Sequence, residues 1–104
     1  MENYIVLVTY DIDSFHAEIK DECKNNGFKD EARHRSLPAS TLYRIVQCST
    51  AQEAVNFVKT QFLKCIKNVA LQEKAEIEVQ NLLVAVIRGN TKNTITNNVV
   101  VPQK

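Results

Sequence analysis

The chain has 104 residues with a net charge of +1, and 44% of them are hydrophobic and 24% charged. This composition is typical of a single globular domain, and it excludes a disordered chain as well as a strongly basic protein that coats nucleic acid by electrostatics alone. No apolar run approaches the roughly 18 residues of a membrane span and no signal peptide is recognisable, so we expect a cytoplasmic protein that does not enter membranes.

The first predicted elements are a strand and a helix. Tyr4–Ile12 is β-branched and aromatic, and Ile5–Val8 is apolar at every position, which is typical of a strand covered on both faces. The segment from Ser14 to Asn26 has apolar residues at every fourth position, which predicts an amphipathic helix. Asp13 or Ser14 is expected to cap its N-terminus, and Gly27 to end it in a left-handed conformation.

The middle of the chain combines a polar segment with an apolar one. Between Lys29 and Arg35 the chain is polar, with Ala32 as its only interior apolar residue, and we expect a charged edge strand there. A turn at Leu37–Ser40 follows, because Pro38 has no backbone N–H. Leu42–Cys48 is then expected to form a central strand of the sheet.

The longest predicted element is a helix from Ala51 to about Leu71. Thr50 and Glu53 form a capping box at its start. One face is apolar at helical spacing, through Ala51, Ala54, Val55, Val58, Phe62, Cys65, Ile66 and Val69. Phe57 and Leu63 lie off this stripe, so they either broaden the buried face or mark a contact surface.

The last predicted strand is Ala75–Arg88, which is apolar on both faces from Leu82 to Ile87. We therefore expect one domain over residues 1–90 and a polar tail over residues 91–104. Within the tail, Val99–Val101 is either a short extra strand or irregular. The three cysteines are 25 and 17 residues apart, which matches no common zinc spacing, so they are expected to be reduced thiols that pack in the core.

The predicted order β-α-β-β-α-β indicates an α+β, ferredoxin-like fold: a four-stranded antiparallel sheet with two helices on one face. The other face of such a sheet should carry polar residues at alternate positions of each strand, yet two neighbouring strands are apolar on both faces. Because monomers avoid a large exposed apolar patch, we expect a homodimer through the open sheet face. The tail could then be a strand swapped onto the partner's sheet edge.

The ending Tyr10-Asp11-Ile12 of the first strand, together with this topology, resembles the small dimeric CRISPR-associated nucleases of spacer acquisition. It is also similar to their relatives, the virulence-associated protein D toxins, the type V endoribonuclease antitoxin and the SinR-like proteins. The stretches LPASTLYRIVQCSTAQEAVNFV and LLVAVIRGN look like the second half of the SinR-like group. The resemblance implies a homodimer in which Asp11 of each subunit lies near the two-fold axis, where the pair holds Mg²⁺ and activates water for phosphodiester hydrolysis.

Three interpretations of the sequence remain open, and the third, a ferredoxin-like dimer that binds a small molecule, has no recognisable ligand motif to support it. In the first, the protein is a metal-dependent endoribonuclease or nuclease-like protein acting on RNA or DNA, with Asp11 as catalytic residue and metal ligand, and with Arg33, Arg35 and Arg44 contacting phosphates. In the second, Asp11 is a solvated strand end, the arginines belong to a charged edge, and the protein is a catalytically silent dimer that binds a protein partner as an antitoxin, regulator or assembly platform. The near-neutral charge favours the second interpretation slightly.

Overall fold

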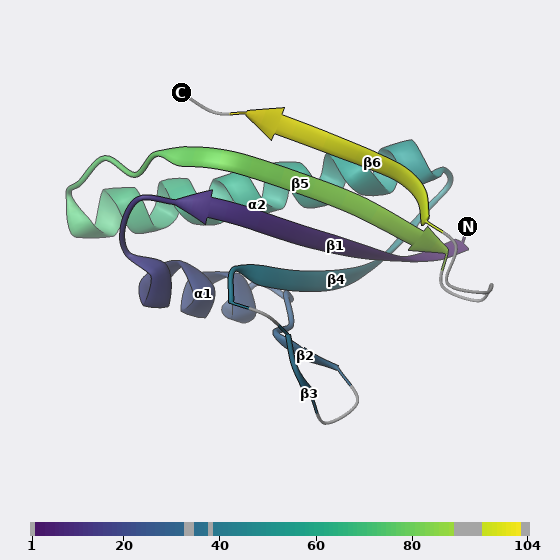
Figure 1. Ribbon diagram of the computed structural model, residues 1–104, viewed down its shortest axis with the longest axis horizontal. Helices are drawn as coiled ribbons and strands as arrows, with labels where there is room; N and C mark the ends of the chain where they lie inside the picture. Colours follow the sequence, from purple (N-terminus) through teal and green to yellow (C-terminus); the bar gives the residue numbers. More distant parts are fainter. Residues whose placement is uncertain (1, 33–34, 38, 89–94, 103–104) are drawn as a thin grey trace.

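The computed structural model of the protein describes residues 2–32, 35–37, 39–88 and 95–102. Figure 1 shows the elements in chain order. They are β1 (Glu2–Ile12), α1 (His16–Asn25), β2 (Glu31–Ala32), β3 (Arg35–Ser36), β4 (Thr41–Cys48), α2 (Ala51–Glu73), β5 (Val79–Arg88) and β6 (Ile95–Pro102). Neither helix is long and apolar enough to cross a bilayer in this described part of the chain.

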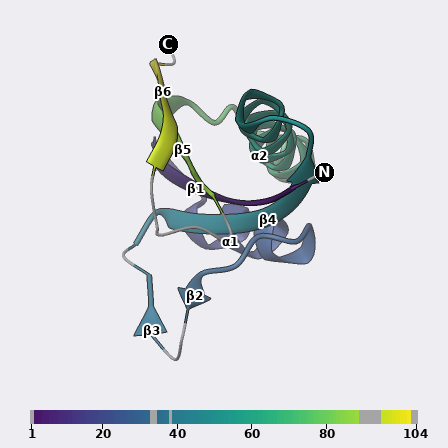
Figure 2. The same ribbon diagram turned by 90° about the vertical axis from the view of Figure 1, so that its right-hand side faces the viewer.

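The core of the sheet consists of three antiparallel strands in the order β4-β1-β5, and β6 pairs with the outer side of β5. Both helices lie on one face of this sheet, as the two views in Figures 1 and 2 show. The core order β-α-β-α-β confirms an α+β fold that is ferredoxin-like in part. It also confirms that β1 is a central strand and that the two helices share one face. The prediction that Leu42–Cys48 is a central strand is wrong: β4 is an edge strand, because the polar segment expected on its outer side does not pair along it in the described part of the chain.

The predicted membership of the sheet is wrong at one edge, because the polar segment from Lys29 to Arg35 is not one of its strands. Among the described residues of this segment, only Lys29 makes backbone–backbone hydrogen bonds to the sheet, of 2.8 and 2.9 Å with Tyr43. The chain then turns away into the small hairpin of β2 and β3. The physical reason is that a segment with one interior apolar residue has little to bury against the helices, so further pairing would gain little.

β6 is longer than the short extra strand expected around Val99–Val101, and it pairs with β5 of the same chain from Asn81↔Pro102 to Ile87↔Ile95. The backbone groups on the outer side of β5 would otherwise have no partner strand.

The helix α1 begins later than predicted, and its predicted cap is wrong. Phe15 occupies the N-cap in the left-handed region at φ 59°, and no side chain caps the helix. Asp13 instead accepts a hydrogen bond from the backbone N–H of Glu78 at 3.0 Å, which holds the end of β1 to the start of β5. The predicted C-terminus is confirmed, because Gly27 has φ 97° directly after the Asn26 cap.

The capping of α2 is confirmed at its first turn. The Thr50 hydroxyl accepts the Glu53 N–H at 3.1 Å, and the Glu53 carboxylate reaches back to the N–H of Ser49 at 3.1 Å. The predicted stripe is buried as a set of seven residues, namely Ala54, Val55, Val58, Phe62, Cys65, Ile66 and Val69. The helix is two residues longer than expected and ends at Lys74 in the left-handed region.

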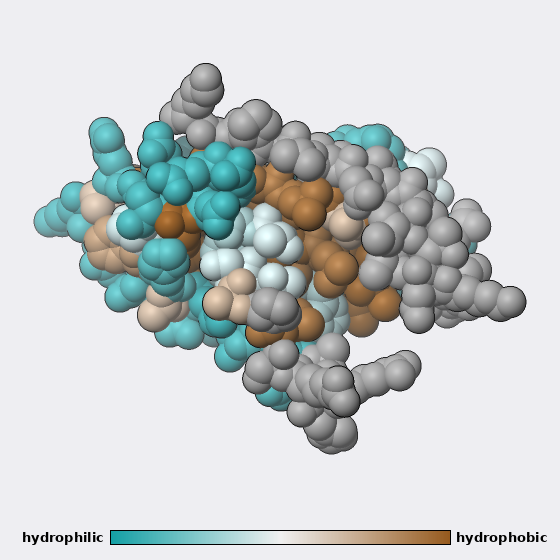
Figure 3. All heavy atoms as spheres, in the orientation of Figure 1, coloured by the Kyte–Doolittle hydropathy of each residue, from teal (hydrophilic) through white to brown (hydrophobic). Residues whose placement is uncertain are grey.

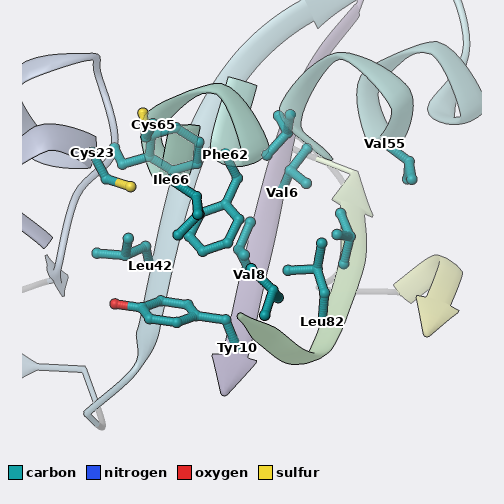
Figure 4. Close-up of a cluster of buried hydrophobic side chains, with 14 of the residues drawn as sticks. Val6, Val8, Tyr10, Cys23, Leu42, Val55, Phe62, Cys65, Ile66 and Leu82 are labelled. Atoms are coloured by element: carbon teal, nitrogen blue, oxygen red, sulfur yellow. The ribbon is translucent and has the colours of Figure 1, made fainter. Parts of the chain in front are cut away.

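The hydrophobic core fills the layer between the helices and the sheet (Figure 4). Phe62 of α2 is fully buried, with its ring centroid 4.8 Å from that of Tyr10 and 6.3 Å from that of Phe28. The even-numbered residues of β1 from Tyr4 to Ile12 point into this layer, and the helix-facing residues of β4 and β5 join them. These strand residues are Tyr4, Val6, Val8, Tyr10, Ile12, Leu42, Val46, Leu82, Val84 and Val86.

Candidate functional site: the open sheet face

The face of the sheet away from the helices carries apolar side chains at its centre. Ile5 and Leu7 of β1 point to this face, and both are half-buried. On the neighbouring strands, Ile45 is 53% exposed and Leu83 is 36% exposed. The register places Ile5 beside Ile45, and Thr9 beside Leu83, so these side chains form one surface. We call Ile5, Leu7, Ile45 and Leu83 the open-face patch.

Figure 3 shows this face directly. Hydrophobic residues lie over the middle of the sheet beside a pale band of near-neutral residues, and hydrophilic residues gather at the end where β1 finishes. The prediction that β1 is apolar on both faces is therefore confirmed, because Val6 and Val8 fill the core while Ile5 and Leu7 face outward. An antiparallel sheet with one solvated face normally alternates apolar and polar residues, and this sheet does not.

Asp11 lies at the hydrophilic end of this same face and is exposed. Its neighbour in the register is Asn81 of β5, whose side-chain N–H₂ donates a hydrogen bond to the Asp11 carboxylate at 3.3 Å. A register shift follows directly between Asp11 and Ile12. The carboxylate therefore lies on the border between the open-face patch and solvent, with free lone pairs available to a further ligand.

Asp11 is not part of a cluster of potential metal ligands among the described residues. Mg²⁺ takes six oxygen ligands and is usually held by one or two carboxylates together with waters and substrate phosphates. Within the described residues, no group of three or more His, Cys, Asp or Glu side chains could hold a metal ion.

The structure does not bring the predicted arginines together with Asp11. Arg33 lies outside the described residues, and for Arg35 only the backbone, in β3, is described. Arg44 pairs with Val6 in the register, so its side chain lies on the helix side of the sheet, opposite to Asp11. Its guanidinium carbon is 5.6 Å from the ring centroid of Phe28 and 5.3 Å from that of Phe57.

The sequence did not indicate a role for Arg44 inside the protein. Its Nη1 atom is buried and has no hydrogen-bond partner in the described part of the chain. Phe57 of α2 is 42% exposed, and its ring lies against the Arg44 guanidinium. The sequence offered one indication of this arrangement. Phe57 lies off the buried stripe of its helix, so it was expected either to broaden the buried face or to mark a contact surface.

Two of the three cysteines are confirmed as core residues. Cys23 of α1 and Cys65 of α2 are almost completely buried, and their thiols are neighbours between the helices. The hydrogen bond to Cys65, together with burial, raises the pKa of the Cys23 thiol far above its usual range. Cys23 therefore stays protonated and packs as a small apolar residue. Cys48 at the end of β4 is half-buried.

Comparisons of the chain with protein-family models, with curated proteins and with solved structures found no significant match. The resemblance drawn from Tyr10-Asp11-Ile12 and the topology therefore stays a prediction.

Proposed function

We propose that this protein is a dimeric binding module whose two sheets pack face to face through the open-face patch. The observation that carries the proposal is the exposure of Ile45 and Leu83, on the strands that flank β1, in a sheet that is already covered by helices on its other face. Contiguous exposed apolar surface of this kind marks interaction sites in soluble proteins. A second copy is the simplest cover, because a two-fold axis lets the same patch serve as both halves of the interface.

The size of the face is sufficient for a specific interface. The molecule measures 42 by 29 Å across its two longer dimensions. Half of a 42 by 29 Å rectangle is about 600 Å² per subunit, or about 1,200 Å² for the two subunits together. This total exceeds the roughly 1,000 Å² that separates specific interfaces from incidental contacts. Two sheets packed in this way lie about 10 Å apart, with the apolar side chains of both filling the space between them.

Sedimentation equilibrium tests this proposal. We expect a species of twice the 11.8 kDa chain mass at micromolar concentration. A chain that sediments as a monomer throughout that range would contradict the proposal.

Metal-dependent phosphodiester hydrolysis is the second candidate function, and the position of Asp11 favours it. Asp11 lies on the face that would be covered, at its hydrophilic end, so a dimer axis near that end of β1 would pair two carboxylates. Such a pair would hold Mg²⁺ with waters completing the octahedron, and the ion would supply an activated water. The balanced charge of the chain weighs against nucleic acid as the main partner and in favour of a silent module with a protein partner.

Cleavage of RNA and of single-stranded and duplex DNA, with Mg²⁺ and with EDTA, separates the two functions. Hydrolysis that needs Mg²⁺ and is lost in Asp11→Asn would support the enzyme, since this substitution keeps the side chain's shape and removes its charge. An absence of cleavage by a protein that dimerises would leave the binding module as its function.

A further inference from the structure

The outer edge of β4 is only partly paired. The backbone N–H and C=O of Tyr43 point outward and bond to Lys29 at 2.9 and 2.8 Å. Because alternate residues of a strand direct these groups to the same side, those of Ile45 and Gln47 also point outward. Beyond Lys29 no described residue pairs with this edge, since the chain leaves for α1 on one side and for the β2–β3 hairpin on the other.

A shallow groove of about 250 Å³ follows this open edge. Its lining residues are Arg44, Ile45, Val46, Gln47, Cys48 and Phe57. Ile45 forms an apolar wall on the open-face side, and Phe57 of α2 forms another on the helix side. An extended chain laid along β4 would therefore find backbone partners in the middle of the groove and apolar contacts on both sides of it.

Arg44 adds a charge requirement to this groove. Its guanidinium lies between the rings of Phe28 and Phe57, and Gly27 leaves room for it, because a Cβ there would come within 3.2 Å of the guanidinium carbon. Nη1 is buried without an acceptor among the described residues, and the ion pair between Lys24 and Asp30 does not involve it. A buried donor without an acceptor is unfavourable, so a carboxylate brought in by a ligand would be bound with a charge-assisted hydrogen bond.

We propose that the outer edge of β4 binds an extended peptide segment of a partner protein by strand addition, and that an acidic residue of this segment pairs with Arg44. A second copy of the chain is a poor occupant, because β4 has the sequence TLYRIVQC and contributes no acid. Two copies joined at this edge would also bring their Arg44 side chains toward each other. The site goes beyond the proposed function, since its backbone partners lie along the edge of the sheet and it shares only Ile45 with the open-face patch.

The test uses the intact chain and two synthetic peptides, acetyl-TVEVT-amide and acetyl-TVQVT-amide, followed by amide chemical shifts in NMR. We expect the Glu peptide to shift the amide signals of Ile45 and Gln47 and to bind about tenfold more tightly than the Gln peptide, because one of its hydrogen bonds is charge-assisted. The variant Arg44→Met keeps the apolar stem between the two phenylalanines, and it should bind both peptides equally.

Two further measurements test the strand geometry. A Glu peptide with N-methyl groups on alternate amides cannot complete the ladder and should bind at least tenfold more weakly in one of its two methylation patterns. Gln47→Pro removes an outward N–H of β4 and leaves the hydrogen bonds to β1 intact. This variant should therefore fold, and it should bind the Glu peptide at least tenfold more weakly than the wild type does.

Several results would overturn the proposal. The first two are a wild-type protein that binds neither peptide, and an Arg44→Met variant that still prefers the Glu peptide. The other two are methylated peptides that bind as tightly as the parent in both patterns, and chemical-shift changes confined to amides outside β4. A single-stranded oligonucleotide that shifts the Ile45 and Gln47 amides more strongly than the Glu peptide would assign the groove to phosphate and also refute it.

Discussion

Replacing Leu83 by lysine should separate the proposed dimer into monomers. Leu83 lies on β5 beside Thr9, within the open-face patch, and 36% of its surface is exposed in the single chain. In a face-to-face dimer this exposed part would be buried, and because of the two-fold symmetry the substituted residue would occur twice in the interface, once in each subunit.

The size of the effect follows from the exposed fraction. Full burial of a leucine side chain contributes about 1.5–3 kcal/mol, so the remaining third is worth about 0.5–1 kcal/mol in each subunit. Two subunits together lose about 1–2 kcal/mol of association free energy. The two introduced ammonium groups add a desolvation cost and repel each other, which brings the total to about 3 kcal/mol or more and raises the dissociation constant at least about a hundredfold.

Sedimentation equilibrium over about 1 to 300 µM protein measures this difference directly. Circular dichroism should show an unchanged fold, because the Leu83 side chain points away from the helix-covered core, into which its neighbours Leu82 and Val84 point. Leu71→Lys is the matched control: Leu71 is 69% exposed on α2, in the other layer of the molecule, so the same change there should leave association unaltered. A Leu83→Lys protein that dimerises as tightly as the wild type would refute the reasoning.

Three further predictions concern single side chains. Asp11→Asn should change the free energy of unfolding by less than about 0.5 kcal/mol in urea, because the side chain is exposed and its hydrogen bond is long; a larger loss would make Asp11 structural. Burial raises the pKa of Tyr10 from 10.0 to about 12. The folded state therefore binds this proton more tightly, so the stability from Tyr10 is present below pH 10 and lost as the pH rises through about 12, by at most about 3 kcal/mol. In urea denaturation between pH 8 and 12, the free energy of unfolding should fall less with rising pH in Tyr10→Phe than in the wild type. Equal falls in the two proteins would contradict the raised pKa of Tyr10. Thr50→Ala should cost about 1 kcal/mol in the same urea assay and Thr50→Ser much less, since only the hydroxyl caps α2.

The features that sequence patterns predicted well are those that depend on near neighbours in the chain. The Thr50 cap, the buried stripe through Phe62, and the positive φ of Gly27 each depend on residues within a turn or two. The burial of β1 on one face and the apolar character of its other face were also predictable, because alternation along a strand assigns each side chain to a face.

The errors concern partners that are distant in the sequence. Asp13 was expected to cap the helix that follows it, but its carboxylate accepts the N–H of Glu78, 65 residues later. The segment after Lys29 was expected to be an edge strand, while β6, from a segment expected to be a tail, pairs along β5. Sequence alone does not show which of two polar segments gains more from pairing with a given edge.

The candidate site was predictable only in part. The position of Asp11 at the end of an apolar strand follows from the sequence, and so does the expectation of an uncovered apolar face. The separation of Arg44 from Asp11 does not follow from the sequence, because the two side chains point to opposite faces only in the observed register between β1 and β4. A shift of that register by one residue would have placed Arg44 on the open face.

The sequence by itself therefore determined which residues are buried within each helix and strand, because hydrophobic periodicity and capping act over a few residues. The tertiary structure alone decided which strands pair, which edge of β4 stays open, and that the Arg44 guanidinium lies between Phe28 and Phe57. These features depend on competition between segments far apart in the chain, and that competition is decided by the apolar area each pairing buries and by the backbone hydrogen bonds it completes.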